Sequence, residues 1–228
     1  MSVTKDEKSS ARDNMLKDLA LFGSCAAPSV RIYGWERPSV TVGHSLTVAD
    51  EIDLEKAAEL GIDVEQRPTG GGIAFHTTED VTYCIAAPLG PQSKSLMDSY
   101  LDISAVLLAA LKDLGVDADL PAAKSGCGLH ATFSSMCFAS PMEYEITVSG
   151  RKLAGSAQKR TRDRLLQQGT VSIKKTPEYF FGLLKKPFDR EAYYRSAVSF
   201  EELSCSKAAF NEVSARVFDR FLSSGLQL

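Results

Sequence analysis

Residues 144–157 have the sequence YEITVSGRKLAGSA, which predicts a β-hairpin. Alternate positions from Tyr144 to Val148 are apolar, and this period of two is typical of a strand with one buried face. Ser149 and Gly150 supply a two-residue turn signal, after which the chain returns as a second strand. Because the strands of a hairpin run in opposite directions, the fold around this segment is expected to contain an antiparallel sheet.

The returning strand mixes cationic side chains with apolar ones. If Leu153 faces the core, alternation places Arg151 on the same face and Lys152 on the opposite one. Lys152 would then lie either in a cleft on that opposite face or in solvent. For a lysine, the pattern by itself favours solvent.

Periodic segments surround the hairpin on both sides. The longest is a helix over 93–115, in which apolar residues from Leu96 to Leu114 recur at spacings of three and four. The first helix is expected to begin at Asn14 as its N-cap. Strands are expected at 29–35, 62–68, 73–76 and 81–88, and helices at 14–23, 53–61, 93–115, 177–184 and 207–224. Because these elements lack regular βαβ alternation, they predict an α+β fold with a mixed or antiparallel sheet flanked by helices.

The composition is ordinary for a globular protein of 228 residues, with 44% hydrophobic residues, 24% charged residues and a net charge of −3. That charge excludes a general attraction to nucleic acid, and no run approaches the roughly 20 apolar residues of a membrane helix. Residues 1–13 have mixed charge, so we expect a flexible N-terminal arm rather than a secretory signal, followed by a single domain over 14–228. The five cysteines are an odd number, which favours reduced thiols and a cytoplasmic location.

Residues 67–76, RPTGGGIAFH, form a glycine loop between two expected strands. No GK[ST] follows the glycines and no helix follows the loop, so this is neither a Walker A loop nor a dinucleotide fingerprint. Consecutive glycines allow the backbone to approach a ligand closely, and Arg67 would suit a carboxylate or a phosphate. A tight turn with a surface arginine explains the pattern equally well, and an isolated histidine such as His76 is more often structural.

Several stretches taken together resemble the lipoate-protein ligase A / octanoyltransferase family, whose catalytic domain shares its fold with biotin protein ligase. The resemblance covers residues 14 to about 175, and it depends on the order and spacing of the stretches more than on any one of them. The stretches are NMLKD (14–18), RIYGWERPSVTVG (31–43), RPTGGGIAFH (67–76), EDVTY (79–83), CFASPMEYE (137–145), GRKLAGSAQKR (150–160) and LLQQGTVSI (165–173).

The resemblance implies a pocket for an octanoyl or lipoyl chain between the glycine loop and the second hairpin strand, in a single catalytic domain over 14–228. Lys152 matches the active-site lysine of the family, which favours the cleft over solvent. Arg151, Lys159 and Arg160 are expected to be solvated or to contact an acidic carrier. The residues that the resemblance assigns to acyl or adenylate binding are Arg67, Gly70, Gly71, Gly72, Ile73, Ala74, His76, Gly155, Ser156 and Ala157.

Two reactions occur in this family. A transferase passes the acyl group from a thioester on acyl carrier protein through its own cysteine and needs no cofactor. Cys137 lies where the single-domain, cysteine-dependent octanoyltransferases have their nucleophile, and a neighbouring ammonium at Lys152 would favour its thiolate. A ligase instead activates free lipoate with ATP and Mg²⁺, and Lys152 would then contact both the carboxylate and the adenylate phosphate.

The sequence contains features of both branches. The GGG of the loop is typical of many ligases, whereas the TTEDVTY that follows His76 is nearer to the transferases. We therefore expect an octanoyl or lipoyl acyltransferase, with the ligase as the alternative. In either case the acceptors would be lipoyl-domain proteins such as the glycine cleavage H protein and 2-oxoacid dehydrogenase E2 subunits.

A free cysteine is more often a small buried hydrophobe than a nucleophile, and Cys84, inside an apolar strand, fits that interpretation. Cys127, His130 and Cys137 would suit three ligands of a zinc ion. This set would belong to a carrier-binding module rather than to an enzyme. No fourth ligand follows at a suitable spacing, so we predict no metal site.

Overall fold

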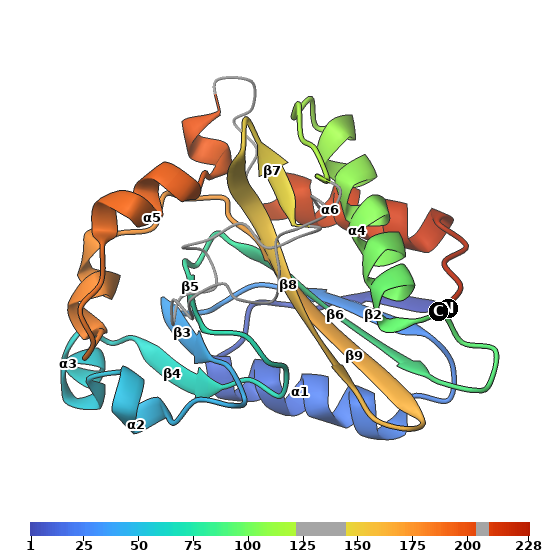
Figure 1. Cartoon of the computed structure of the whole chain (residues 1–228), viewed down its shortest axis with the longest axis horizontal. Coiled ribbons are helices and arrows are strands. Elements are labelled where there is room, and N and C mark those ends of the chain that lie inside the picture. The colour runs from blue at the N-terminus through green and yellow to red at the C-terminus, as the bar shows by residue number, and fades with distance from the viewer. Residues whose placement is uncertain (122–144, 204–209) are drawn as a thin grey trace, which may run out of the picture.

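The computed structural model describes residues 1–121, 145–203 and 210–228, which form two β-sheets with helices packed around them (Figure 1). The six-stranded sheet has the order β1-β2-β6-β9-β8-β7, in which β1 and β2 are parallel and the other neighbours antiparallel. Its strands are β1 (Ser2–Lys5), β2 (Ser29–Tyr33), β6 (Val81–Pro88), β9 (Arg164–Val171), β8 (Arg151–Arg160) and β7 (Ile146–Val148). The three-stranded sheet consists of β4 (Asp63–Gln66), β3 (Ser39–Val42) and β5 (Ile73–His76), in that order.

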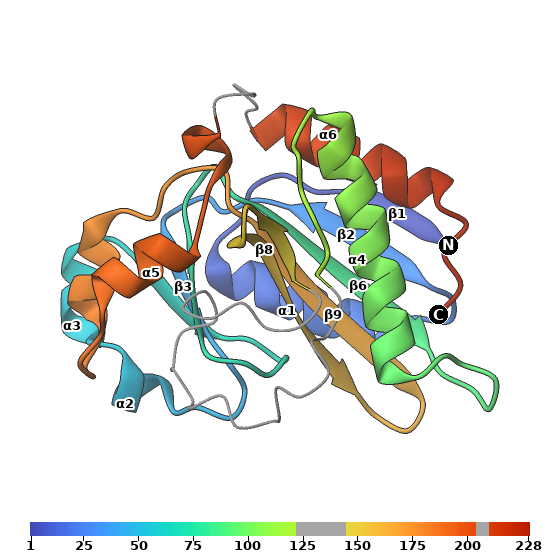
Figure 2. The same cartoon turned by 45° about the horizontal axis from the view of Figure 1, so that its top comes forward.

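Helices cover both faces of the large sheet (Figure 2). On one face lie α4 (Leu96–Asp113) and α6 (Phe210–Ser223), and on the other lies α1 (Ala11–Ser24). The small sheet packs against α3 (Leu54–Glu59), α5 (Arg190–Ser196) and the 3₁₀ turn η1 (Glu178–Leu183), which together enclose a second hydrophobic core. The remaining short elements are α2 (Val48–Glu51) and η2 (Phe200–Glu202). This architecture confirms the expected α+β fold with a mixed sheet.

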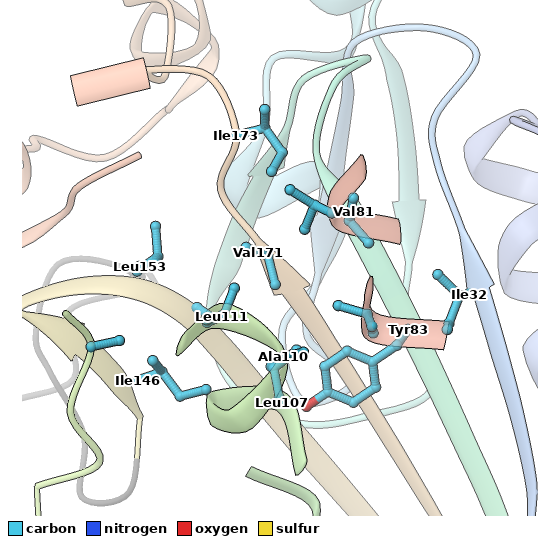
Figure 3. Close-up of a cluster of buried hydrophobic side chains, with 14 of the residues drawn as sticks. Ile32, Val81, Tyr83, Leu107, Ala110, Leu111, Ile146, Leu153, Val171 and Ile173 are labelled. Atoms are coloured by element: carbon cyan, nitrogen blue, oxygen red, sulfur yellow. The ribbon is translucent and has the colours of Figure 1, made fainter. Parts of the chain in front are cut away.

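The main core lies between the large sheet and α4, where the apolar stripe of the helix meets the strands (Figure 3). Ile103, Leu107 and Leu111 are fully buried, as the spacing predicted, whereas Leu96 at the start of the stripe stays 47% exposed. Ser95 caps the helix by accepting a hydrogen bond from the backbone of Asp98. Each buried leucine or isoleucine contributes about 1.5–3 kcal/mol to the stability of this layer.

The N-terminal segment differs from the flexible arm expected over residues 1–13. Residues 2–5 pair with β2 as the edge strand β1, and Asp6 forms an ion pair with the buried Arg31. The first helix also begins before Asn14, because Ser10 caps it at the residue preceding Ala11. Asn14 is instead buried inside the helix, where its amide donates to backbone carbonyls, including that of Gly34. Strand pairing with β2 and the ion pair with buried Arg31 therefore hold this polar segment against the sheet.

Two further features concern the helices of the fold. The segment expected as a helix after Pro177 is the 3₁₀ turn η1, whose aromatic residues Phe180 and Phe181 pack into the second core. Within the described ranges, no helix combines the length and the apolar character that crossing a membrane would require.

Candidate functional site

Lys152 is buried on the opposite face of β8 from the main core. Its side chain is 1% exposed, while Leu153 and Ala154 both pack into the core against α4. The hairpin register explains this: Thr147 pairs with Lys152 and Ile146 with Ala154, so Leu153 is the extra residue of a β-bulge. The bulge places Lys152 on the same face as Gly155, whereas strict alternation would separate them.

The Lys152 side chain runs along β8 and ends at a buried carboxylate. Its Nζ donates to Oε1 of Glu145 at 2.5 Å, and Glu145 is only 5% exposed. Gly155 makes room for this arrangement, because a Cβ at that position would lie 2.4 Å from Cε of Lys152 and 2.7 Å from its Nζ. The lysine that the hairpin pattern alone assigned to solvent is therefore buried.

The glycine loop is folded against the end of β3. A Cβ on Gly43 would lie 1.9 Å from the carbonyl oxygen of Gly71, so only glycine permits this approach. Gly71 itself has a φ of 87°, a conformation that side chains disfavour. The backbone N–H of Gly43 donates to the carbonyl of Gly72, and that of His44 to the carbonyl of Thr69.

Arg67 is buried at 5% exposure rather than at the surface, and it supports the loop from inside. Its guanidinium donates to the carbonyl of Gly70 at 2.7 Å and to that of Thr41 at 3.0 Å. The loop carbonyls thus serve as acceptors. The N–H groups of Gly70 and Gly71 donate to no residue that the structure describes, which makes them available to an anionic or carbonyl oxygen.

A side-chain hydrogen bond links the glycine loop to the large sheet. Thr69 Oγ1 donates to Oε1 of Gln168 on β9 at 2.7 Å, and both residues are buried. Gln168 is paired in register with Ala157 on β8, two residues beyond Gly155. The loop and the Lys152 face of β8 therefore belong to the same side of the sheet.

The other candidate residues occupy different positions. Ile73 and Ala74 are buried in β5, directly after the loop. Ser156 faces the side of the sheet that α4 and α6 cover, because its hydroxyl lies 2.6 Å from that of Tyr83 in the main core. Of the three residues Gly155, Ser156 and Ala157, the first and last therefore face the glycine loop.

His76 is an interior residue of the second sheet. Its ring stacks on Trp35 with centroids 4.1 Å apart, and Nε2 lies 2.9 Å from the hydroxyl of Thr41. Burial, with a smaller contribution from the Arg67 charge, lowers the pKa of His76 to about 3. This histidine is neutral at physiological pH, and its contacts fit the structural interpretation.

Two of the expected surface cations of β8 instead hold other elements in place. Arg160 donates to the carbonyls of Lys94 and Ser95 and to the Ser99 hydroxyl, at the start of α4. Arg151 donates to the carbonyl of Ala197 and to Glu202. Both residues remain partly exposed, with 34% of the Arg151 side chain accessible, so contact with an acidic carrier stays a prediction.

Lys159 lies with its Nζ 5.9 Å from the centroid of the Phe22 ring. Arg164, the first residue of the neighbouring strand β9, donates to the carbonyls of Phe22 and Gly23 at the end of α1.

Cys137 lies outside the described residues, as do Cys127 and His130. Cys84 is fully buried, as expected, and desolvation raises its pKa well above the usual value, so it is no candidate for a thiolate. In the described part of the chain no group of three or more His, Cys, Asp or Glu side chains is suited to hold a metal ion.

Three polar residues that support the site, Glu145, Thr69 and Gln168, are not identified by the sequence patterns described above. Glu145 was treated only as part of a strand, and Thr69 and Gln168 only as letters within longer motifs. Thr69 directly precedes the three glycines, and this position is the signal that could have identified it, whereas Glu145 and Gln168 lie near other polar residues and carry no such signal. No pattern in the sequence pairs one with another, however.

Comparison with known proteins places these features in a family. The model of the lipoyl protein ligase A/B catalytic domain matches residues 10–221. Octanoyltransferase LipM of Carboxydothermus hydrogenoformans is 35% identical over 216 residues, which cover 90% of this chain and 78% of that protein. Octanoyltransferase LipM of Kyrpidia tusciae is 33% identical, covering 94% of this chain and 83% of the relative.

Solved structures show the same fold at lower identity. The bipartite lipoate protein ligase of Thermoplasma acidophilum superimposes with a TM-score of 0.76 at 17% identity, covering 96% of this chain and 81% of that one. A biotin protein ligase from Aquifex aeolicus gives a TM-score of 0.51 at 10% identity, covering 97% of this chain and 68% of that one. With a family model that matches nearly the whole sequence and relatives above 30% identity, this chain belongs to the lipoyl protein ligase A/B catalytic domain family.

Proposed function

We propose that this protein is an acyltransferase that places an octanoyl or lipoyl group on a specific lysine of lipoyl-domain proteins. The observation that carries the proposal is the buried Lys152, held by Glu145 on the face of β8 that also receives the glycine loop. The names of the relatives, octanoyltransferases at 30–35% identity, support this chemistry over others on the same fold.

The donor in this proposal is an octanoyl thioester of acyl carrier protein, and the nucleophile is Cys137. The Cys137 thiolate attacks the thioester carbonyl, forms a new thioester and releases the carrier as a thiolate, which takes up a proton. The neutral amine of the acceptor lysine then attacks octanoyl-Cys137. An amide forms as the C–S bond breaks, the nitrogen gives up one proton, and the Cys137 sulfur leaves as a thiolate that takes up a proton. Thioester exchange is nearly neutral in free energy and aminolysis is favourable, so the transferase needs neither ATP nor a metal.

We assign Lys152 the electrostatic role in both steps. A cation beside Cys137 favours its thiolate, and it offers a proton to the departing sulfur. The N–H groups of Gly70 and Gly71 are the proposed donors to the tetrahedral oxyanion, a contribution typically worth about 2.7–4 kcal/mol per donor. In this proposal the acyl chain contacts Gly155 and Ala157 on the Lys152 face of β8, while Arg67, Gly72, Ile73 and Ala74 act through the glycine loop. Ser156 and His76 point to other parts of the interior and take no part in acyl binding.

Acceptor proteins within this proposal are the glycine cleavage H protein and the E2 subunits of 2-oxoacid dehydrogenases. The proposal also includes a single catalytic domain, formed by residues 14–228 together with the edge strand β1, and a cytoplasmic location.

Intact-protein mass spectrometry after mixing with octanoyl carrier protein tests the covalent step. We expect one octanoyl adduct, located on Cys137, which disappears when a lipoyl domain is added and reappears there as an amide. Cys137→Ser should abolish the adduct, and the matched variant Cys25→Ser should retain it. Full transfer activity in Cys137→Ser would refute the proposal.

The ligase alternative differs in its requirements. An ATP-dependent ligase would modify the lipoyl domain from free lipoate with ATP and Mg²⁺, and it would catalyse exchange between pyrophosphate and ATP. Octanoyl transfer without ATP, together with the absence of that exchange when a separate accessory domain is supplied, would exclude it.

A further inference from the structure

A chain of buried polar groups runs from α1 to the glycine loop. At its centre Asp18 of α1 is completely buried, and its carboxylate accepts from Arg31 Nη1 at 2.6 Å and from the Tyr33 hydroxyl at 2.8 Å. The same carboxylate accepts from Nε2 of Gln168 at 2.6 Å. Burying an ion pair costs several kcal/mol of desolvation, so this arrangement is not explained by stability alone.

Gln168 connects that ion pair to the loop, and its amide orientation follows from its partners. The amide nitrogen points to Asp18, which accepts hydrogen bonds from three side chains, so the amide oxygen is turned toward Thr69. Thr69 Oγ1 then donates to this oxygen at 2.7 Å, and its carbonyl accepts from the backbone of His44. Thr69 is the residue that immediately precedes the three glycines.

The backbone of Gln168 lies in the middle of the large sheet, between Cys84 on β6 and Ala157 on β8. Its position relative to β8 is therefore fixed by ladder hydrogen bonds on both sides. The Thr69 hydroxyl transmits that fixed position to the glycine loop, which lies outside the sheet.

We propose that Thr69 and Gln168 form a latch that sets the position of the glycine loop relative to β8, with the Arg31–Asp18 pair holding the Gln168 amide in place. These are positioning residues, not catalytic ones, and the inference rests on the proposed function only for its effect on acyl transfer. Reactions of this type are sensitive to placement, and a displacement of about 1 Å costs roughly 100-fold in rate.

The test compares Thr69→Val, which removes the hydroxyl at nearly constant shape, with Thr69→Ser, which restores it. The matched control is Thr82→Val. Thr82 is also buried and accepts from Trp35 Nε1 at 2.9 Å, but it makes no hydrogen bond to the loop. All variants keep the full chain and are assayed as purified protein.

Hydrogen exchange gives a readout that does not depend on activity. The amides of Gly43 and His44 are protected by bonds to the loop carbonyls of Gly72 and Thr69. Thr69→Val should accelerate their exchange about tenfold, as expected for loss of one buried hydrogen bond, and Thr69→Ser should return it near the wild-type rate. Thr82→Val should leave the exchange rates of these two amides unchanged, even if it lowers the melting temperature as much as Thr69→Val does.

Acyl transfer provides the second readout. We expect kcat/KM to fall roughly 10- to 100-fold in Thr69→Val and to recover in Thr69→Ser. Unchanged exchange of Gly43 and His44 in Thr69→Val, or equal acceleration in Thr82→Val, overturns the latch. If wild-type protein transfers no acyl group, the proposed function fails while the exchange result still decides the latch.

Discussion

The Lys152 Nζ lies 2.5 Å from Oε1 of Glu145, and the two side chains are 1% and 5% exposed. Charges withdrawn from water in this way depend on each other, since removing one partner leaves the other buried without that counter-charge. The pair also fixes where the Lys152 cation is presented along β8. This gives the first prediction.

Glu145→Gln should lower the rate of acyl transfer by at least about tenfold and the free energy of unfolding by roughly 3–5 kcal/mol. Transfer is measured in single turnover and stability by urea denaturation. The matched control is Glu201→Gln, which removes the carboxylate of the solvent-exposed pair with Lys174. That change should cost about 1 kcal/mol or less. Equal behaviour of the two variants would contradict a special role for Glu145.

Gly155→Ala should separate activity from stability. The added methyl group would lie 2.4 Å from Cε of Lys152, which can move because it lies near the end of a flexible side chain. We therefore expect a small loss of stability, about 1 kcal/mol, and a large loss of transfer as the ammonium is displaced. Gly23→Ala in α1 is the control, because a Cβ there meets nothing within 4 Å. Retention of full activity in Gly155→Ala would show that the position of the ammonium is not critical.

Gly43→Ala should lower both the stability of the protein and its rate of acyl transfer. Here the new Cβ would lie 1.9 Å from the backbone oxygen of Gly71, and a backbone atom cannot move aside without moving the loop. A cost of about 1–3 kcal/mol in stability is expected, together with loss of transfer. Gly90→Ala, where a Cβ also meets nothing within 4 Å, should be close to wild type in both assays. A wild-type melting temperature in Gly43→Ala would argue against the packing of the loop described above.

The lowered pKa of His76 predicts how the free energy of unfolding depends on pH. Its pKa is about 3 in the folded protein, against an ordinary value of 6.5, so the unfolded chain binds the proton more tightly. The stabilising contribution is complete above pH 6.5 and is lost as the pH falls toward 3, by up to about 1.4 kcal/mol per pH unit.

Urea denaturation at pH 7.5, 6 and 5 measures this dependence. His76→Gln should be less stable at pH 7.5 but should show a shallower decline, with about 2 kcal/mol less loss between pH 7.5 and 5. The same decline in wild type and variant would assign the acid sensitivity to other groups.

Local patterns predicted most elements of the fold, and the misses have identifiable physical causes. The turn at Ser149 and Gly150 has positive φ angles at both residues, as its sequence indicated. The period of two failed at Leu153, because a bulge is set by pairing with β7 and leaves no mark in composition. Residues 2–5 became a strand because β2 offered an unpaired edge, a feature of the assembled sheet rather than of the segment.

The site was predicted only in part, for a related reason. Lys152 and the glycine loop were found because family motifs include them. Glu145, Thr69 and Gln168 become meaningful only as partners, and 99 positions separate Thr69 from Gln168. Single-sequence patterns carry little information about contacts over that separation.

The two arginines next to the turn between β8 and β9 influence which parts of the molecule unfold together. Arg160 is bonded to the start of α4, on one face of the sheet, and Arg164 to the end of α1, on the other. A fluctuation that frees this end of the hairpin therefore releases both helical layers together. The end of α1 and the start of α4, remote in sequence, should belong to one cooperative opening unit instead of fraying independently.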